Sequence, residues 1–314
     1  MLIMYATIKW AARAFGKNEY SNDEFIKKYS IDSSDEWIVN MTGIKKRYII
    51  EDSDDFELMI TSTVKSAANG EQIDGIIVAS STNFYRFPGL SQLVHRNLEY
   101  DNNVRTLDVN GACNGFMQAL AIANSWIQNE NMNNVIVVGA DAMSSILDMN
   151  DRSTNCLFGD GVGAVLLSKS ETEGIISFEH ATISKNCEAL VAKDHIIMNG
   201  RAVFDTSIKA FESVILNVIK KADKKIEDID LFVLHQANAR IFQSLANRMN
   251  ISQEKIPFFA SEFANTSAAT IPISLSFIDK FNGKNFEQKF KNIVLAGFGA
   301  GFISSASLIS YEVK

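Results

Sequence analysis

The sequence predicts an α/β protein made of two similar halves, each a sheet covered by helices. Short β-rich runs alternate with longer helical patterns, such as GFMQALAIANSWIQN (115–129) and VFDTSIKAFESVILNVIKKA (203–222). This alternation is typical of largely parallel sheets with helices on their faces. Three pairs of segments also recur in the same order, the second copy 152 to 158 residues after the first. We therefore expect one half over residues 1–170 and a second half over 171–314.

The repeated segments share one pattern, in which an apolar strand ends in a loop of small or polar residues. In the first pair the strand runs into a polar loop. In the second pair a tight loop of small residues leads into a helix, and in the third the strand ends in glycine. The pairs are DGIIVASSTN (74–83) with DLFVLHQAN (230–238), VRTLDVNGACNGFMQALAIA (104–123) with IPFFASEFANTSAATIPISLSF (256–277), and NNVIVVGADAMS (133–144) with KNIVLAGFGAGF (291–302).

The composition describes a globular protein and argues against several other classes. The 314 residues are 46% hydrophobic, which is enough for a sizeable core. The net charge of −7, from 30 Lys and Arg against 37 Asp and Glu, argues against a surface for nucleic acid. No apolar run approaches the roughly 18 residues that span a membrane. The opening MLIMYATI is predicted to be a strand and not a secretion signal, because Lys9 and Arg13 follow at once.

The cysteines indicate a reducing compartment and no metal centre. Cys113, Cys156 and Cys187 are odd in number and widely spaced, without a C-x-x-C pair or a histidine ladder nearby. This spacing predicts neither a disulfide framework nor a zinc site. We therefore expect a cytoplasmic protein without a bound metal.

Four candidate functional positions, Cys113, His235, Asn265 and Gly299, lie where predicted strands end. In open α/β sheets functional groups gather at such ends, because helix N-termini there offer free N–H groups. If Cys113 lies in the first turn of the following helix, the helix dipole lowers the pKa of its thiol and makes it an acyl acceptor. Taken singly, three of these residues also have a structural interpretation. Cys113 can be a small core residue, His235 a core or loop histidine, and Asn265 a helix N-cap. The two matched halves favour a shared site.

A set of cysteine, histidine and asparagine fits two chemical schemes. In a hydrolase, His235 activates Cys113 and Asn265 orients the histidine. In a condensing enzyme, His235 and Asn265 donate hydrogen bonds to a thioester oxygen and stabilise the enolate that forms when a carboxylate is lost. The glycines of GFGAG (297–301) permit a tight turn whose amide groups can face an oxyanion. The spacing of the residues does not choose between the two schemes.

Seven motifs in register resemble β-ketoacyl-acyl-carrier-protein synthase III, a family of the thiolase-like superfamily. They run in the family's order and cover most of the chain, whereas 5–32 and 171–197 match poorly. The resemblance implies a thiolase-like fold of two duplicated α/β halves, with central mixed sheets in a layered αβαβα arrangement, and a homodimer without metal or cofactor. The motifs are SSDEWIVNMTGIKKRYI (33–49), DVNGACNGF (108–116), LFGDGVGAVLL (157–167), NGRAVF (199–204), HQANARI (235–241), ANTSAATIPISL (264–275) and GFGAGF (297–302).

The resemblance implies a two-stage acyl transfer. Cys113 takes an acyl group from an acyl-CoA, which is a substrate and not a cofactor. A malonyl group on acyl carrier protein then loses carbon dioxide and attacks the acyl-enzyme, which gives a β-ketoacyl product for fatty acid or related acyl-chain biosynthesis. His235 and Asn265 are implied to stabilise the enolate, and the backbone amides of Cys113 and Ala300 to form the oxyanion hole.

The resemblance also implies contacts to the substrate. Trp37 and Arg152 match the pair that sandwiches the CoA adenine, as a flat ring and a flat guanidinium can. Phe87 matches the aromatic residue that crosses the dimer interface to shape the acyl pocket, and Asn238, in HQANARI, is implied to contact the substrate. Met41 replaces an arginine that commonly meets the CoA phosphates, so primer binding is expected to be weaker or different.

Carrier-protein docking is expected on the segment after His235. Arg240 and Arg248 lie about two helical turns apart and can share one face, where they would steer an acidic carrier protein. A solvated helix face is the alternative for these arginines, and Asp205 stands where the family is often basic.

Two other functions stay open from the sequence. Some relatives on this fold pass the cysteine-bound acyl group to a hydroxyl or amine without forming a carbon–carbon bond. The departures at Met41, Asp205 and 171–197 leave room for that reaction. A function of a different class is a non-catalytic partner subunit that keeps the fold, and the intact set of cysteine, histidine and asparagine argues against it.

Overall fold

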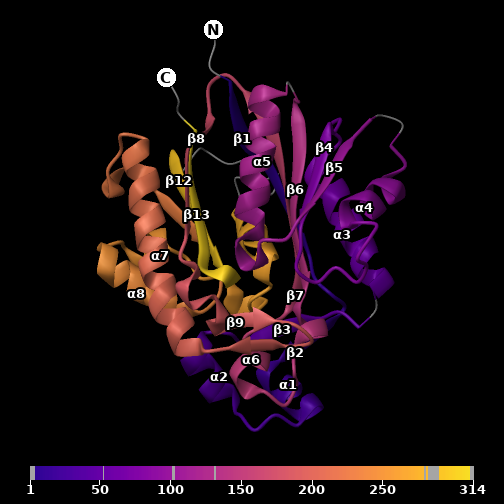
Figure 1. Ribbon diagram of the computed structural model, residues 1–314, viewed down its shortest axis with the longest axis vertical. Coiled ribbons are helices and arrows are strands. Elements are labelled where there is room, and N and C mark those ends of the chain that lie inside the picture. The colour runs from indigo at the N-terminus through magenta and orange to yellow at the C-terminus, as the bar shows by residue number, and fades with distance from the viewer. Residues whose placement is uncertain are drawn as a thin grey trace.

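The chain folds into two mixed sheets that lie next to each other, with helices between them and on both outer faces (Figure 1). This is the layered α/β arrangement that the sequence predicts. The computed structural model describes residues 4–51, 53–100, 103–130, 132–278, 281 and 290–311.

The first sheet is built from residues 5–170. Across it the strands follow the order β1 (Tyr5–Ala14), β7 (Asp160–Ser170), β6 (Asn134–Ala142), β4 (Gly75–Ala79) and β5 (Arg105–Val109). β4 pairs in parallel with β5 and β6, and β7 is antiparallel to both β6 and β1. Every residue of β4 is buried, as expected for a strand covered on both faces.

The second sheet repeats this order in the described residues, without a counterpart of β5. Its strands are β8 (Gly174–Thr182), β13 (Ile303–Ser310), β12 (Asn292–Gly299) and β11 (Leu231–Leu234). They occupy the places of β1, β7, β6 and β4, in agreement with the repeated segments. β11 and β12 are parallel, whereas β13 is antiparallel to β12 and β8. The expectation of largely parallel sheets is therefore wrong, because the turn Ala300–Phe302 returns the chain at once and such a short connection joins only antiparallel strands.

Three pairs of helices form the remaining layers. The outer pairs are α3 (Ser53–Ala68) with α4 (Leu90–Leu98) and α7 (Gly200–Lys221) with α8 (Ala239–Met249), and the pair between the sheets is α5 (Gly115–Asn129) with α9 (Thr270–Ser276). The hydrophobic cluster around α5 includes Val137 of the first sheet and Leu295 of the second. Both sheets therefore bury apolar surface against the same central helices. The division into halves at about residue 170 stays a prediction.

The limits of the two predicted helices agree with the structure to different degrees. α5 begins and ends where its pattern predicts. α7 begins at Gly200, three residues before the predicted start, because the side chain of Asn199 accepts a hydrogen bond from the Ala202 N–H and caps the helix there. Among the described residues, no helix has the length and apolar character that crossing a membrane requires.

The strand expected at the start of IPFFASEFANTS (256–267) does not form. Pro257 has no N–H to give to a ladder, and the N–H of Phe259 donates instead to Oε1 of Gln236 at 2.7 Å. Short 3-10 turns follow and lead into α9. This segment therefore reaches the centre of the molecule as a loop.

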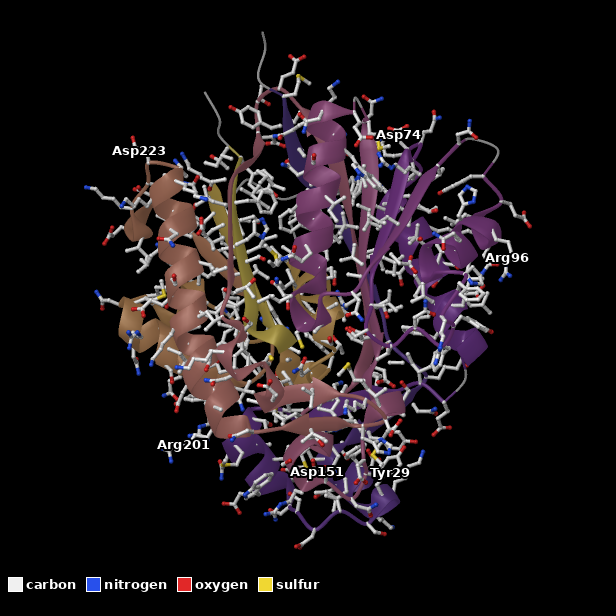
Figure 2. The ribbon with its side chains drawn as sticks, viewed as in Figure 1. Tyr29, Asp74, Arg96, Asp151, Arg201 and Asp223 are labelled. Carbon is white, nitrogen blue, oxygen red and sulfur yellow. The ribbon has the colours of Figure 1, made fainter. Side chains whose placement is uncertain are left out.

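Smaller elements gather at the end of the molecule opposite the chain termini (Figure 1). Buried Arg47 links some of them: its guanidinium donates to the Asn155 and Phe158 carbonyls at 3.1 and 3.3 Å and to Oδ1 of Asn22 at 2.7 Å. Figure 2 shows Arg201 and Asp151 at this end and Asp74 and Asp223 at the other. The elements are β2 (Asn18–Ser21), α1 (Asn22–Tyr29), α2 (Asp35–Thr42), β3 (Lys46–Ile49), α6 (Arg152–Asn155), β9 (Leu190–Ala192) and β10 (Ile196–Met198).

Two glycines let the start of α9 touch the first sheet through its backbone. Gly139 and Gly163 lie opposite each other on β6 and β7. A Cβ at Gly163 would lie 2.5 Å from the Ile273 nitrogen, and one at Gly139 would overlap the Ala268 carbonyl. Glycine is therefore required at both positions for this close approach.

We expect Gly139→Ala to lower the free energy of unfolding by about 1–3 kcal/mol, because the added methyl group must push the Ala268 backbone away. Urea unfolding monitored by circular dichroism measures the change. Gly200→Ala is the control, since its Cβ would meet only the Met198 methyl group at 3.9 Å. Equal stability of the two variants would contradict the requirement for glycine at position 139.

Candidate active site

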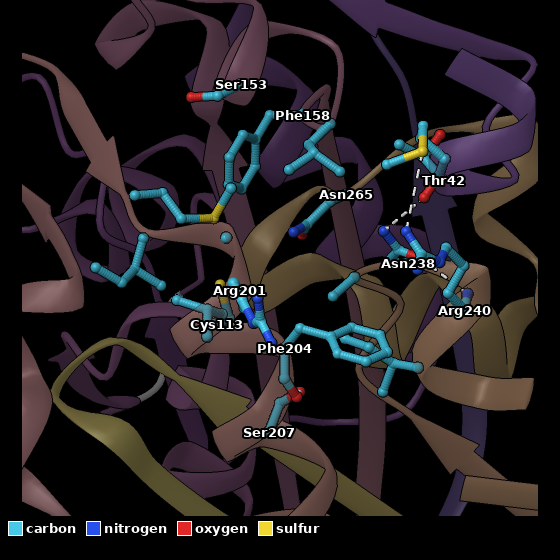
Figure 3. A pocket seen from close by; sticks show the side chains of 18 of the residues that line it. Thr42, Cys113, Ser153, Phe158, Arg201, Phe204, Ser207, Asn238, Arg240 and Asn265 are labelled. Atoms are coloured by element: carbon cyan, nitrogen blue, oxygen red, sulfur yellow. Dashed lines mark hydrogen bonds between the residues drawn. The ribbon is translucent and has the colours of Figure 1, made fainter. Parts of the chain in front are cut away.

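A cavity of about 580 Å³ is lined by Cys113, His235 and Asn265 together. Figure 3 shows Cys113 and Asn265 in its wall. Cys113 follows β5, His235 follows β11, and Asn265 precedes α9. The three side chains predicted from strand-end loops therefore meet at one place. Gly299, at the end of β12, also lines this cavity.

Cys113 lies in the 3-10 turn Ala112–Asn114, which leads directly into α5. The residue keeps some accessible surface where it lines the cavity. Burial nevertheless raises the pKa of its thiol to about 11, the Ser267 hydroxyl opposes the rise, and the charge of Asp141 adds to it. The thiol is therefore neutral at pH 7 in the free site. This differs from the lowered pKa expected from the helix dipole, because Cys113 precedes α5 and burial is the largest influence on its thiol.

His235 is fixed from behind and is electrically neutral. Only 3% of the residue is exposed, and burial lowers the pKa of its imidazole to about 3 although the Ser267 carbonyl partly opposes this. Its backbone N–H donates to the Ala296 carbonyl at 2.8 Å, and its Nδ1 lies 2.7 Å from Oγ1 of Thr270. The partner that orients the ring is thus Thr270.

Asn265 is held by backbone hydrogen bonds on both sides. Its N–H donates to the Leu157 carbonyl at 3.0 Å, and its carbonyl accepts from the Gly159 N–H at 3.1 Å. Its side-chain Oδ1 accepts from the Ser267 N–H at 2.9 Å. This contact assigns the oxygen of the amide and leaves the Nδ2 group as the donor on the cavity side.

Asp141 is a buried carboxylate behind the site that the sequence reasoning did not select. It accepts hydrogen bonds from the Ser81 N–H at 2.7 Å, Oγ1 of Thr82 at 3.1 Å and the Ala268 N–H at 3.0 Å. Burial raises its pKa despite these donors. It therefore ties the loop after β4 to the turn that follows Asn265. Its one signal in the sequence is its place at the end of the apolar run VIVVGAD, which does not reveal the donors that surround it.

The end of β12 lies beside the turn that carries the thiol. The end of β12 packs against the turn of the cysteine, since a Cβ on Gly299 would lie 3.0 Å from the Cys113 nitrogen. Ala300 follows in the turn Ala300–Phe302. Gly299 lines the cavity, whereas Ala300 is not among the described residues that line it.

The mouth of the cavity contains three of the predicted binding residues. The guanidinium of Arg152 lies 4.8 Å over the Trp37 ring, and its Nη1 donates to the Asp32 carbonyl at 2.9 Å. Asn238 caps α8 by accepting from the Arg240 N–H and donates from Nδ2 to the Met41 carbonyl at 3.0 Å. Both functions of this amide are therefore engaged in linking α8 to α2.

The two arginines predicted for docking have different surroundings. Arg240 lines the cavity, with its guanidinium 3.9 Å from the Met41 sulfur and 5.6 Å from the Phe204 ring. Arg248 pairs with Glu212 at 2.5 Å at the other end of α8. Asp205 is also in the cavity wall, 4.0 Å from the Arg201 side chain. The cavity mouth thus combines Arg152, Arg201 and Arg240 with a single acidic neighbour among the described lining residues.

Phe87 lies outside the cavity of its own chain. It is 85% exposed, and the same loop exposes Phe84 and Tyr85 by 45% and 49%. Three aromatic side chains in one exposed loop are typical of a surface that another protein covers.

Among the described residues, no group of three or more His, Cys, Asp or Glu side chains could hold a metal ion.

Comparison with known proteins identifies the family of this arrangement. The family model of 3-oxoacyl-[acyl-carrier-protein] synthase III matches residues 107–184, and the model of its C-terminal part matches 219–311. The chain is 38% identical over 307 residues to the β-ketoacyl-[acyl-carrier-protein] synthase III of Staphylococcus aureus, covering 95% of this chain and 96% of the relative. It is 37% identical to the enzyme of Neorickettsia sennetsu, over 90% and 92% of the two chains.

The fold leads to the same family. The crystal structure of 3-oxoacyl-[acyl-carrier-protein] synthase III from Aquifex aeolicus superimposes with a TM-score of 0.90 at 36% identity, over 98% of this chain and 100% of that one. The structure from Pseudomonas aeruginosa has the same TM-score at 29% identity, over 98% of each chain. The thiolase-like fold expected from the motifs is thereby confirmed, and the chain belongs to the β-ketoacyl-[acyl-carrier-protein] synthase III family of acyltransferases.

Proposed function

We propose that the chain condenses an acyl group from acyl-CoA with a malonyl group on acyl carrier protein, using Cys113, His235 and Asn265. First the Cys113 sulfur attacks the acyl thioester, the carbon–sulfur bond to CoA breaks, and the thiol proton leaves with the CoA thiolate. Then the malonyl carboxylate leaves as carbon dioxide, and its bonding electrons pass into an enolate. The enolate carbon attacks the acyl-enzyme, and the Cys113 thiolate is released and reprotonated.

One observation carries the choice of condensation over hydrolysis. The ring of His235 is oriented by Thr270, and the amide of Asn265 is oriented by the Ser267 N–H. A hydrolase requires the asparagine to orient the histidine and the histidine to activate the cysteine. His235 and Asn265 have separate partners in this site, so they do not form such a series. Both remain available to donate to one thioester oxygen in the cavity that they share. Two donors aimed at one developing enolate are the arrangement that decarboxylation needs.

The resting charges support the same choice. A cysteine hydrolase commonly keeps a thiolate beside an imidazolium. In this site the pKa of the Cys113 thiol is raised to about 11 and the pKa of His235 is lowered to about 3. Both groups are thus neutral at pH 7. A neutral imidazole can donate a hydrogen bond to an enolate without giving up its proton.

The backbone amides of Cys113 and Ala300 are proposed to hold the oxyanion of the acyl transfer. The contact of Gly299 with the Cys113 nitrogen supports this, because it brings the two amides into adjacent turns. A group bound there would receive two hydrogen bonds from rigid backbone. Many members of the family have glycine where this chain has Ala300, and alanine keeps the backbone amide.

The CoA moiety is proposed to enter between Trp37 and Arg152, with Asn238 beside it. A flat base between two flat groups requires about 7 Å, since carbon atoms pack at about 3.5 Å on each side. The two groups are 4.8 Å apart in the structure. Binding of the base therefore requires the Trp37 ring and the Arg152 guanidinium to move apart. The hydrogen bond from Arg152 to the Asp32 carbonyl then changes with the position of the guanidinium.

The carrier protein is proposed to dock on α8 through Arg240 and Arg248. Arg240 has no acidic partner among its contacts given above, whereas Arg248 must exchange Glu212 for a carrier carboxylate. We therefore expect Arg240 to contribute more to docking.

The reaction uses acyl-CoA as a substrate and draws on no resident cofactor. The three cysteines are free, in keeping with the cytoplasmic location that the composition predicts.

The enzyme is proposed to act as a homodimer in which Phe87 enters the acyl pocket of the partner. The exposure of Phe87, Phe84 and Tyr85 in one loop supports a covered surface there. The acyl chain that fits is then set by both subunits.

The roles of His235 and Asn265 predict a split between the two half-reactions. His235→Ala and Asn265→Ala are expected to keep the acyl adduct on Cys113 and to lose condensation by ~100-fold or more, because each removes an enolate donor. Mass spectrometry after acyl-CoA exposure measures the adduct, and labelled malonyl carrier protein measures carbon dioxide and ketoacyl product. Cys113→Ala is the control without an adduct.

Other outcomes of this experiment point elsewhere. A Cys113 adduct without carbon dioxide release would support transfer to a hydroxyl or amine. No adduct at all would support a non-catalytic subunit. Unchanged carbon dioxide release in both variants would refute the roles of His235 and Asn265.

The raised pKa of Cys113 predicts how its reactivity depends on pH. Because the thiolate fraction grows as pH rises toward about 11, alkylation by iodoacetamide should accelerate ~10-fold per pH unit between pH 7 and 9. Peptide mass mapping follows the modified Cys113. Cys113→Ala gives the background from Cys156 and Cys187. A rate that levels off below pH 8 would show that the helix terminus outweighs burial.

The place of Phe87 predicts complementation between subunits. Phe87→Ala should change the preferred acyl-chain length of the adduct on Cys113. In a mixed dimer with Cys113→Ala, the active cysteine of the Phe87→Ala subunit receives Phe87 from its partner. The original preference should then return, as scored with a panel of acyl-CoAs. Without this return, Phe87 does not act across the interface.

A further inference from the structure

The hydroxyl of Thr270 lies between two acceptors. Its Oγ1 is 2.7 Å from Nδ1 of His235 and 3.1 Å from the Ser267 carbonyl oxygen. A hydroxyl has one proton, so it donates to the ring or to the carbonyl, but not to both. The choice decides which nitrogen of a neutral imidazole carries the ring proton.

The two arrangements give His235 opposite chemical properties. When Thr270 donates to Nδ1, the ring proton is on Nε2, and the cavity side of the ring is a hydrogen-bond donor. When Nδ1 carries the proton, it donates to Thr270 or to the Ser267 carbonyl, and Nε2 is a bare acceptor. A bare Nε2 would repel an enolate oxygen.

We propose that Thr270 is a positioning residue that holds His235 as the Nε2–H tautomer by donating its hydroxyl proton to Nδ1. The shorter of its two contacts is the one to the ring. The Ser267 carbonyl does not need the hydroxyl, because it also accepts the backbone N–H of Thr270. The inference rests on the proposed function, in which His235 donates to the enolate.

The surroundings keep this hydroxyl in place. Thr270 is fully buried, so water does not compete for its proton. Its own carbonyl accepts from Oγ of Ser274 at 2.7 Å, and the start of α9 rests on Gly139 and Gly163. The turn from Ser267 to Thr270 thereby orients both donors: Ser267 fixes the amide of Asn265, and Thr270 fixes the ring of His235.

Nitrogen-15 NMR of histidine-labelled protein tests the tautomer directly, since the chain has only 4 histidines and His235→Gln identifies the signal. The wild type should show a protonated Nε2 and an unprotonated Nδ1. Thr270→Val removes the donor at nearly constant volume and should move the proton to Nδ1, toward the Ser267 carbonyl. Thr270→Ser should restore the wild-type pattern. Ser276→Ala, which removes a buried hydroxyl of the same helix that donates to the Ile273 carbonyl and contacts neither Thr270 nor the ring, should leave the pattern unchanged.

Kinetics test the consequence for the reaction. Thr270→Val should lower the kcat of condensation ~100-fold, as for loss of an oxyanion donor, with little change in KM or in formation of the Cys113 adduct. Thr270→Ser should recover the rate to within ~3-fold, as rescue by a retained hydroxyl requires. A large rise in KM, or equal loss in both variants, would indicate a merely structural role and overturn the proposal.

The spectrum of the wild type decides the matter even if Thr270→Val does not fold. A protonated Nδ1 in the wild type overturns the proposal, and so does a Thr270→Val protein with the wild-type pattern or with full condensation. If the wild type makes no ketoacyl product, the proposed function fails, whereas the spectra still report which nitrogen Thr270 leaves protonated.

Discussion

The backbone contact between the start of α9 and the first sheet is the constraint on which the candidate site depends. Gly139 and Gly163 have no side chains, so the segment after Asn265 can approach β6 and β7 closely. Asp141, two residues after Gly139, accepts the Ala268 N–H from the same segment. A turn fixed by sheet backbone and a buried carboxylate can hold two side-chain donors at the tolerance that enolate stabilisation requires.

The site is arranged for hydrogen-bond donation and not for charge. The proposed nucleophile, Cys113, and His235 are both neutral at pH 7, and the buried carboxylate of Asp141 has its own hydrogen-bond donors. Among the described residues that line the cavity, positive charge comes from the three arginines of its mouth, where anionic groups of a thioester carrier would arrive. This separation keeps the reacting centre in surroundings of low polarity, where a developing negative charge gains most from fixed dipoles.

The sequence was sufficient for the family, for most of the repeated order of elements and for selecting Cys113, His235 and Asn265 as side chains that meet in one cavity, because each of these leaves a local pattern. Helix 115–129 was predicted to the residue, and two of the three repeated pairs, 74–83 with 230–238 and 133–144 with 291–302, contain strands at equivalent places in the two sheets. Contacts between distant side chains leave no such pattern. Thr270 orients His235 from 35 residues away, and this contact depends on the rotamers of both side chains. The loop 256–259 is a second example, because a strand was expected there and the Phe259 N–H donates instead to the side chain of Gln236. The hydrogen bonds of Asp141 and the burial that raises the pKa of the Cys113 thiol likewise leave no local pattern in the sequence.

The layer shared by α5 and α9 has a consequence for the ancestry of the chain. Each sheet leaves one face to helices that the other half also contacts, so neither half alone would cover its apolar surface. A single ancestral copy of the repeated unit would have been stable only when paired with a second copy of itself. In this chain the first copy carries the cysteine and the second carries the histidine and asparagine, so the pairing that covers the apolar surface also brings these side chains to one cavity.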